Sequence, residues 1–270
     1  MAQLAGLPDG YDADREIQRR GSPERIVTWN DAVRLQPQSS AVVGNGGLDI
    51  CDAESKMKAT IHRIRIWALD PPTRLLFLPG ASGNTEIWRP VAERLRHGAE
   101  RIHQGWPGFG GERLDSRVQG FDDLLQLVLE RLDRPTAVIA QSMGGVLALQ
   151  AALAAPHRIT HLVLAVTSGG LPMVEHGAED WREAFAAAHP QLPDWFDASN
   201  VDLSDQLPAL TIPTLLLWGD ADPISPVEVG KRLASRLPDA HLVILSGGTH
   251  DLAMERAQEI APLIDRHLST

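Results

Sequence analysis

The chain has 270 residues, of which 43% are hydrophobic, enough for a substantial core in one large domain or two small ones. Its formal net charge is −10, and no cluster of lysine and arginine interleaved with aromatic residues occurs, so we expect neither nucleic acid nor an anionic surface as a partner. No apolar run approaches the roughly 20 residues that span a bilayer, and the N-terminal stretch has no secretory pattern, so we expect a cytoplasmic protein without a membrane partner.

Residues 1–57 form an N-terminal extension to which we assign no function. Residues 1–35 are polar and charged and show no hydrophobic period, whereas residues 39–51 predict a β-hairpin around Asn45-Gly46. The alternating residues 58–69 predict a further early strand. Cys51 is the single cysteine, which excludes an internal disulfide and a thiolate metal site, and we expect it to be a small buried apolar residue.

From residue 75 onward, short apolar runs alternate with helical patterns. The predicted strands lie within 74–80, 100–106, 136–141, 161–166, 214–220 and 240–248, and helical patterns separate them and close the chain at 251–268. Such alternation predicts an α/β fold, with a mostly parallel central sheet covered by helices on both faces. We therefore place the core of the chain at residues 58–166 and 211–270.

The alternation stops between residues 167 and 210, a stretch too long for an ordinary loop. Within it, Ala178, Trp181, Phe185 and Ala188 form an apolar helical stripe that ends before Pro190. We interpret the segment as a small helical cap insertion; the alternative is a surface helix anchored by core packing.

Residues 136–154 predict a strand, a sharp turn and a helix, with Ser142 in the turn. Gly144 and Gly145 would let the helix backbone pass close to the strand, so that the serine hydroxyl projects from the sheet edge. This is the shape of a nucleophile elbow, although Ala140 stands where the first glycine of G-x-S-x-G usually lies. The alternative is an ordinary strand-to-helix connection whose serine caps the helix.

A serine, an acid and a histidine follow three different predicted strands. Ser142 is followed along the chain by Asp220 and Asp222 after the apolar run "TLLLW", and by His250 after the run "LVILSGG". Ligands of parallel sheets bind beyond the carboxyl ends of the strands, and this chain order is that of a Ser-Asp-His triad. His250 would act as the base that takes the proton of Ser142.

From about residue 58 to the C-terminus, the sequence resembles the α/β-hydrolase superfamily. The resemblance lies in the segments "LFLPGASGNTEIW", "GWPGFGGE", "AQSMGG", "LLLWGDADPISP" and "LSGGTHDLAMERAQEI". Two positions depart from the commonest pattern of the superfamily: Pro79 replaces a histidine before the oxyanion glycine, and Ala140 replaces the first glycine of the elbow. The resemblance implies a serine-nucleophile, esterase-like branch with a small cap.

The same resemblance assigns several site residues. It selects Asp222 as the acid of the triad, which leaves Asp220 to shape the turn; Asp251 is expected to cap the final helix. The oxyanion hole would consist of two N–H groups. One belongs to Met143, at the start of the helix, and the other belongs to Ala81 in the loop after the first strand, which the resemblance assigns by analogy. The hydroxyl of Ser82 could assist.

A serine at the elbow favours acyl transfer, since relatives that displace halide or open epoxides carry an aspartate there. The insertion contains eight acidic residues and one basic residue, Arg182, a balance that would repel polyanionic substrates unless these charges lie on the outer face. Apolar walls of a substrate pocket are expected from Trp181, Phe185, Trp195 and Phe196. The leading hypothesis is therefore a serine hydrolase of a small to medium, neutral carboxylic ester.

Two other hypotheses stay open at this point. The same triad could hydrolyse a thioester, hydrolyse a carbon–carbon bond or act as a lyase, and a non-enzymatic ligand-binding protein could use the same scaffold. No H-E-x-x-H or comparable spacing occurs, so we expect no metal site, and the chemistry requires no cofactor. The sequence does not fix the oligomeric state.

Overall fold

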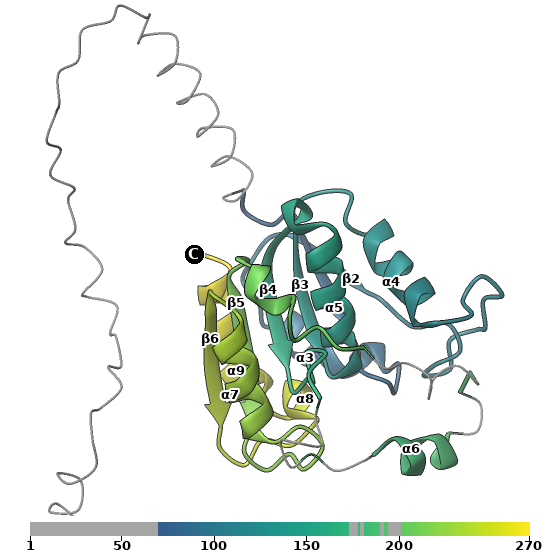
Figure 1. Ribbon diagram of the computed structural model, residues 1–270. Helices are drawn as coiled ribbons and strands as arrows, with labels where there is room; N and C mark the ends of the chain where they lie inside the picture. Colours follow the sequence, from purple (N-terminus) through teal and green to yellow (C-terminus); the bar gives the residue numbers. More distant parts are fainter. Residues whose placement is uncertain (1–69, 173–177, 179–180, 190–191, 194–200) are drawn as a thin grey trace, which may run out of the picture. The chain divides into compact units, whose positions relative to one another are not determined.

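The computed structural model describes residues 70–172, 178, 181–189, 192–193 and 201–270 (Figure 1). The expected hairpin and strand before residue 70, Cys51, and the pocket residues Trp195 and Phe196 lie outside the described residues. In the part of the chain that the structure describes, no helix has the length and apolar character that a bilayer-crossing segment needs.

A six-stranded, wholly parallel sheet forms the centre of the fold, with the strand order β2-β1-β3-β4-β5-β6. The strands are β1 (Arg74–Leu78), β2 (Glu100–His103), β3 (Thr136–Gln141), β4 (Ile159–Ala165), β5 (Thr214–Gly219) and β6 (Ala240–Leu245). Every residue of β1, β3 and β5 is buried, as expected for strands covered on both faces. The predicted α/β fold class is confirmed.

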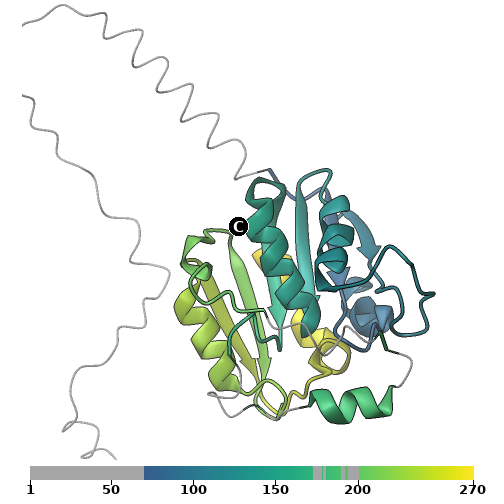
Figure 2. The ribbon, with the colours of Figure 1, turned by 45° about the vertical axis from the view of Figure 1, so that its right-hand side comes forward.

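Helices cover both faces of this sheet (Figure 2). One face carries α4 (Phe121–Glu130), α5 (Met143–Ala154) and α7 (Val227–Arg236), and the other carries α3 (Arg89–Ala92), α8 (Leu252–Glu255) and α9 (Ala257–His267). Short 3₁₀ turns lie at η2 (Thr85–Trp88), η3 (Pro156–Arg158) and η6 (Leu207–Ala209). Eight of the twelve residues of α5 are buried, so this helix lies at the centre of its layer and not at the surface.

The strand order places a switch point between β1 and β3. After β1 the chain moves outward to β2, and it then returns to pair β3 on the other side of β1. A crevice at the carboxyl ends of the strands opens where the direction of winding reverses, and this is where ligands bind in such sheets. The loop after β1, which contains Ala81, and Ser142 after β3 both lie at this point.

Two predicted helices differ from those observed. The helix predicted from Ala178 onward begins later than expected. The observed helix, α6, spans Arg182–Ala188, and Trp181 stands at its N-cap without a side-chain cap hydrogen bond. The predicted final helix is divided into α8 and α9 at Arg256, whose φ of −112° and ψ of 27° do not continue an α-helix.

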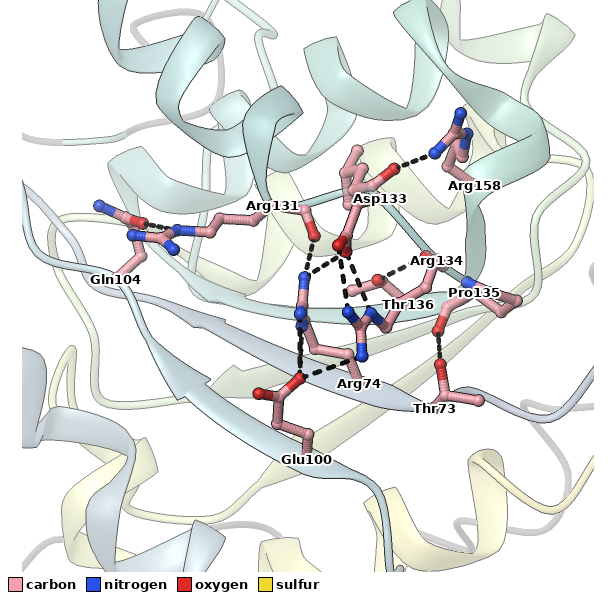
Figure 3. A network of polar contacts seen from close by, with 11 residues as sticks. Thr73, Arg74, Glu100, Gln104, Arg131, Asp133, Arg134, Pro135, Thr136 and Arg158 are labelled. Carbon is pink, nitrogen blue, oxygen red and sulfur yellow. Dashed lines mark hydrogen bonds and ion pairs between the residues drawn. The ribbon is translucent and has the colours of Figure 1, made fainter.

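At the amino end of the sheet, Arg74 joins three segments of the chain (Figure 3). Its guanidinium donates to Glu100 Oε2 at 2.9 Å, to Asp133 Oδ1 at 2.7 Å and to the main-chain oxygen of Arg131 at 2.6 Å. Arg134 contacts the same two carboxylates from the surface, at 3.8 Å and 3.1 Å. These contacts fix β1, β2 and the connection from α4 to β3 at the end of the sheet opposite to Ser142.

Candidate active site

Ser142 occupies a sharp turn between β3 and α5. Its φ of 53° and ψ of −123° lie outside the regions that L-residues ordinarily adopt. The turn requires glycine at position 144, because a Cβ there would lie 2.5 Å from the oxygen of Pro79. Ala140 is fully buried within β3, so the core accommodates the methyl group that distinguishes this turn from the commonest pattern. The predicted strand, sharp turn and helix are therefore present.

The structure brings Ser142, His250 and Asp222 together from three loops. His250 Nε2 lies 3.0 Å from Ser142 Oγ, and His250 Nδ1 lies 2.8 Å from Asp222 Oδ2. An ionised carboxylate only accepts hydrogen bonds, so Nδ1 carries the ring proton and Nε2 accepts from the serine hydroxyl. The Asp222 side chain is fully buried, and that of His250 is 21% exposed, so the imidazole is partly accessible while the carboxylate beside it is shielded from water.

The turn after β5, residues 219–225 (the acid turn), holds Asp222 in place and gives Asp220 a different contact. The Ile224 N–H donates to Asp222 Oδ1 at 2.9 Å, which leaves Oδ2 for the imidazole. Asp220 instead accepts from the Gly247 N–H. This bond joins the acid turn to the loop after β6, residues 246–250 (the histidine loop). The geometry therefore agrees with the assignment of Asp222 to the imidazole and of Asp220 to the turn.

Asp251 takes the predicted N-cap position, that of α8, but its side chain does not cap the helix, because it makes no cap hydrogen bond. Its φ of −95° and ψ of 20° differ from the extended backbone from which a capping side chain reaches back to the first turn.

Gln141 fixes the histidine loop to the strand that carries the serine. Its Nε2 donates to the main-chain oxygen of His250 at 3.0 Å, and the residue is only 4% exposed. Its Oε1 lies against Gly80, where a Cβ would approach it to 2.7 Å. One buried amide therefore contacts both the histidine loop and the loop after β1, a role that the sequence pattern did not reveal.

Two buried tryptophans support the loop that contains Ala81. Trp88 Nε1 donates to Leu78 O at 3.1 Å, and Trp106 Nε1 donates to Pro79 O at 3.2 Å. Within the described residues, no hydrogen bond uses the N–H of Ala81 or that of Met143 at the start of α5. The structure therefore shows no acceptor within the described residues for either predicted oxyanion donor.

Three further predicted pocket residues lie in the described part of the chain: Ser82 is exposed, and Trp181 and Phe185 are half-buried. The Oγ of Ser82 accepts from the Asn84 N–H at 3.3 Å. Trp181 and Phe185 pack against the core, with ring centroids 5.4 Å apart, and His189 stacks on Phe185 at 4.2 Å. The aromatic row on α6 therefore includes a histidine that the sequence pattern did not single out.

Among the described residues, no group of three or more histidine, cysteine or acidic side chains is arranged to hold a metal ion. The carboxylate and imidazole at the site contact each other and the serine hydroxyl. The site thus brings together a serine hydroxyl, an imidazole and a buried carboxylate.

Comparison with known proteins identifies the family. The sequence profile of the alpha/beta hydrolase family matches residues 75–263. The chain belongs to this family. Its membership confirms the resemblance seen in the sequence, and the protein is a hydrolase of the α/β-hydrolase type.

Relatives of this α/β hydrolase include enzymes of several named activities. A poly(3-hydroxyalkanoate) depolymerase of Ectopseudomonas oleovorans is 30% identical over 239 residues, covering 73% of this chain and 84% of the relative. A pimeloyl-[acyl-carrier protein] methyl ester esterase of Aliivibrio salmonicida is 20% identical, covering 72% of this chain and 91% of the relative.

Solved structures show the same fold. A hydrolase from Pseudomonas aeruginosa superposes with a TM-score of 0.61 at 22% identity, covering 75% of this α/β hydrolase and 92% of the other chain.

Proposed function

We propose that this α/β hydrolase is a serine hydrolase of small to medium, neutral carboxylic esters that acts through an acyl-enzyme. One observation carries the proposal: Asp222, His250 and Ser142 form a continuous line of hydrogen bonds, at 2.8 Å and 3.0 Å. In this arrangement the imidazole is oriented at Nδ1, and its Nε2 is free to take the hydroxyl proton.

In the proposed reaction, Ser142 Oγ attacks the ester carbonyl carbon while its proton moves to His250 Nε2. The resulting oxyanion accepts hydrogen bonds from the N–H groups of Ala81 and Met143. The tetrahedral intermediate collapses, the C–O bond to the alcohol breaks, and His250 gives its proton to the leaving oxygen. A water molecule then loses a proton to His250 and attacks the acyl carbon. The second tetrahedral intermediate collapses, the bond between the acyl carbon and Ser142 Oγ breaks, and His250 returns the proton to Ser142 Oγ as the acid leaves.

The preference for a neutral, partly apolar ester rests on the insertion at 167–210, which we propose to be a cap. Trp181 and Phe185 of this insertion pack against the core, and we propose that they form apolar walls together with Trp195, Phe196 and, at the rim, Ser82. The acidic composition of the insertion favours a neutral substrate over a polyanionic one.

The test uses the full chain and a series of p-nitrophenyl esters of increasing acyl length. Ser142→Ala should abolish turnover while the protein keeps the circular dichroism spectrum and Tm of the wild type. Ser235→Ala removes the hydroxyl of an exposed serine on α7 and serves as the control, since it should retain the wild-type activity. Unchanged turnover in Ser142→Ala would refute the proposed nucleophile.

A second candidate substrate is an oligomeric ester of 3-hydroxy acids. The 30% identity to a poly(3-hydroxyalkanoate) depolymerase, over 84% of that relative, favours it. A comparison of kcat/KM for simple esters, 3-hydroxyacyl oligoesters, thioesters and carbon–carbon substrates would rank these reactions. A protein that turns over none of them and resists a fluorophosphonate would instead be a ligand-binding relative.

A further inference from the structure

Two residues other than glycine have positive φ in the described part of the chain, and they are neighbours in space. Ser142, with φ 53°, follows β3, and Val166, with φ 42°, follows β4. The last paired residues of these two parallel strands are Gln141 and Ala165, so Ser142 and Val166 each follow directly after this pair. A β-branched residue with positive φ is an outlier, and such strain persists only where the surrounding structure enforces it. The turn at Val166 therefore calls for an explanation.

The turn at Val166 directs the next residue, Thr167, toward the nucleophile. Thr167 is fully buried, and its Oγ1 donates to the main-chain oxygen of Ser142 at 2.6 Å. The same Oγ1 accepts from the Gly169 N–H at 3.1 Å. Because an N–H can only donate and a carbonyl can only accept, the direction of the Thr167 hydroxyl proton is fixed.

Thr167 completes a set of contacts that hold the backbone of Ser142 on both sides. The Ser142 N–H donates to Ala165 O at 2.9 Å, and the Ser142 oxygen accepts from Thr167 and from the Gly145 N–H, also at 2.9 Å. The threonine packs so closely on α5 that a Cβ at Gly145 would lie 2.6 Å from its side chain. The position of the serine hydroxyl is therefore coupled to the turn after β4.

The same turn reaches the acid of the site through Ser225. Ser225 Oγ donates to Thr167 O at 3.5 Å, and the oxygen of Ser225 accepts from Trp218 Nε1 at 2.9 Å. Ser225 lies three residues beyond Asp222, and both are buried. Thr167 thus stands between the turn that carries the serine and the turn that carries the acid.

We infer that Thr167 is a positioning residue of this hydrolase: its hydroxyl holds the strained backbone of Ser142 in the orientation that brings Oγ to His250. The inference rests on the proposed function, since it requires Ser142 to be the nucleophile. Removal of the hydroxyl should lower the rate of the chemical step and leave substrate binding unchanged, because Thr167 is buried behind the serine.

The experiment compares three variants of the full chain in p-nitrophenyl ester hydrolysis and in phosphonylation of Ser142 by a fluorophosphonate. Thr167→Val keeps the shape of the side chain and removes the donor, whereas Thr167→Ser keeps the donor. Thr214→Val is the matched control, because Thr214 is 2% exposed, lies at the amino end of β5 and donates to Ile212 O at 2.8 Å.

We expect Thr167→Val to lower kcat and the phosphonylation rate by about three- to tenfold with KM within about twofold of wild type. Thr167→Ser should restore most of the rate, and Thr214→Val should lower Tm without lowering kcat. Equal kcat in Thr167→Val and wild type, or equal losses in Thr167→Val and Thr167→Ser, would overturn the inference.

A second pair of variants keeps the test decisive if valine does not fit. Thr167→Ala and Thr167→Ser differ only in the hydroxyl, so the inference requires a slower phosphonylation rate in the alanine variant. Failure of the proposed function would be distinct from failure of the inference, because wild-type Ser142 would then not react with the probe.

Discussion

At the scale of single residues, the proposed mechanism requires the carboxylate of Asp222 to keep the ring proton of His250 on Nδ1. The Ile224 N–H holds Oδ1, so an amide at position 222 would present its NH₂ group to Nδ1. Nδ1 would then have to accept, and the ring proton would move to Nε2, where it opposes proton transfer from Ser142. We predict that Asp222→Asn lowers kcat for ester hydrolysis by roughly 10³- to 10⁴-fold with little change in Tm.

Asp220 provides the control for this prediction, because it lies two residues away on the same turn. Its carboxylate accepts from the Gly247 N–H, and an asparagine can accept the same hydrogen bond through Oδ1. Asp220→Asn should therefore lose only a few-fold in kcat. Similar losses in the two variants would contradict the assignment of Asp222 to the imidazole.

The residues that sequence analysis found are those marked by local pattern and chain order. Ser142, Asp222 and His250 each follow a predicted strand, and the structure brings all three together. Thr167 and Gln141 had no such signal, because their contacts depend on the pairing of β3 with β4 and on the approach of the histidine loop. The dihedral angle of Val166 is equally invisible in the sequence.

At the scale of elements, the acid turn and the histidine loop touch through their backbones. A Cβ at Gly219 would lie 2.1 Å from the oxygen of Gly248, so any side chain there would force the two loops apart. We predict that Gly219→Ala lowers Tm and lowers kcat by at least about tenfold, since overpacking of this kind costs about 1–3 kcal/mol and displaces His250 from Ser142.

Gly98→Ala is the matched control, because a Cβ at Gly98 would meet no atom within 4 Å. Its kcat and Tm should stay close to those of the wild type. A Gly219→Ala variant with wild-type kcat would show that the contact between the two loops does not position the histidine.

Element order was predictable from the sequence, while element ends depended on tertiary contacts. Alternation of apolar runs with helical patterns identified all six strands that the structure describes. The division of the last helix at Arg256 was not predicted, because the Arg256 guanidinium turns back to donate to Ser246 O at 2.8 Å. The hydrophobic period of the sequence cannot predict this hydrogen bond, because it joins residues ten positions apart.

At the scale of the whole molecule, Arg74 and Arg134 contact the same two carboxylates from different depths (Figure 3). The side chain of Arg74 is 9% exposed and also satisfies the oxygen of Arg131, whereas that of Arg134 is 47% exposed. We predict that Arg74→Met lowers the free energy of unfolding by about 1–3 kcal/mol. Arg134→Met should lower it by less than about 1 kcal/mol.

Denaturant unfolding of the two variants measures this difference, and ester hydrolysis should proceed at the wild-type kcat in both. The network lies at the amino end of the sheet, so a large loss of kcat in either folded variant would contradict the separation between the stabilising end and the reactive end. Equal destabilisation would show that burial of Arg74 adds nothing.

Acid stability should depend on a histidine pair at the amino end of β4. Burial, together with the neighbouring His267 and His97, lowers the pKa of His161 to about 4. Burial also lowers the pKa of His267, whose Nε2 lies 3.0 Å from Leu162 O and which has Asp239 and His241 nearby. An unfolded histidine titrates near 6.5, so between about pH 6.5 and pH 4 the folded state binds fewer protons than the unfolded state.

The sign of the effect follows from this difference in proton binding. The free energy of unfolding should fall as pH is lowered through this range, and His161→Phe should flatten that dependence, because it keeps the ring packed on His267 without a titrating group. His157→Phe, at an exposed position, should retain the wild-type slope. An unchanged slope in His161→Phe, measured by Tm at pH 7 and pH 4.5, would contradict the prediction.

The central claim is that three distant loops make Ser142 a nucleophile, and covalent labelling tests it most directly. The full-length wild type and Ser142→Ala should be incubated with a fluorophosphonate and then analysed by intact mass and peptide mapping. The account predicts one phosphonyl adduct per wild-type chain, on Ser142, and none in the variant. A wild-type chain that stays unlabelled, or an adduct on another residue that persists in Ser142→Ala, would contradict it.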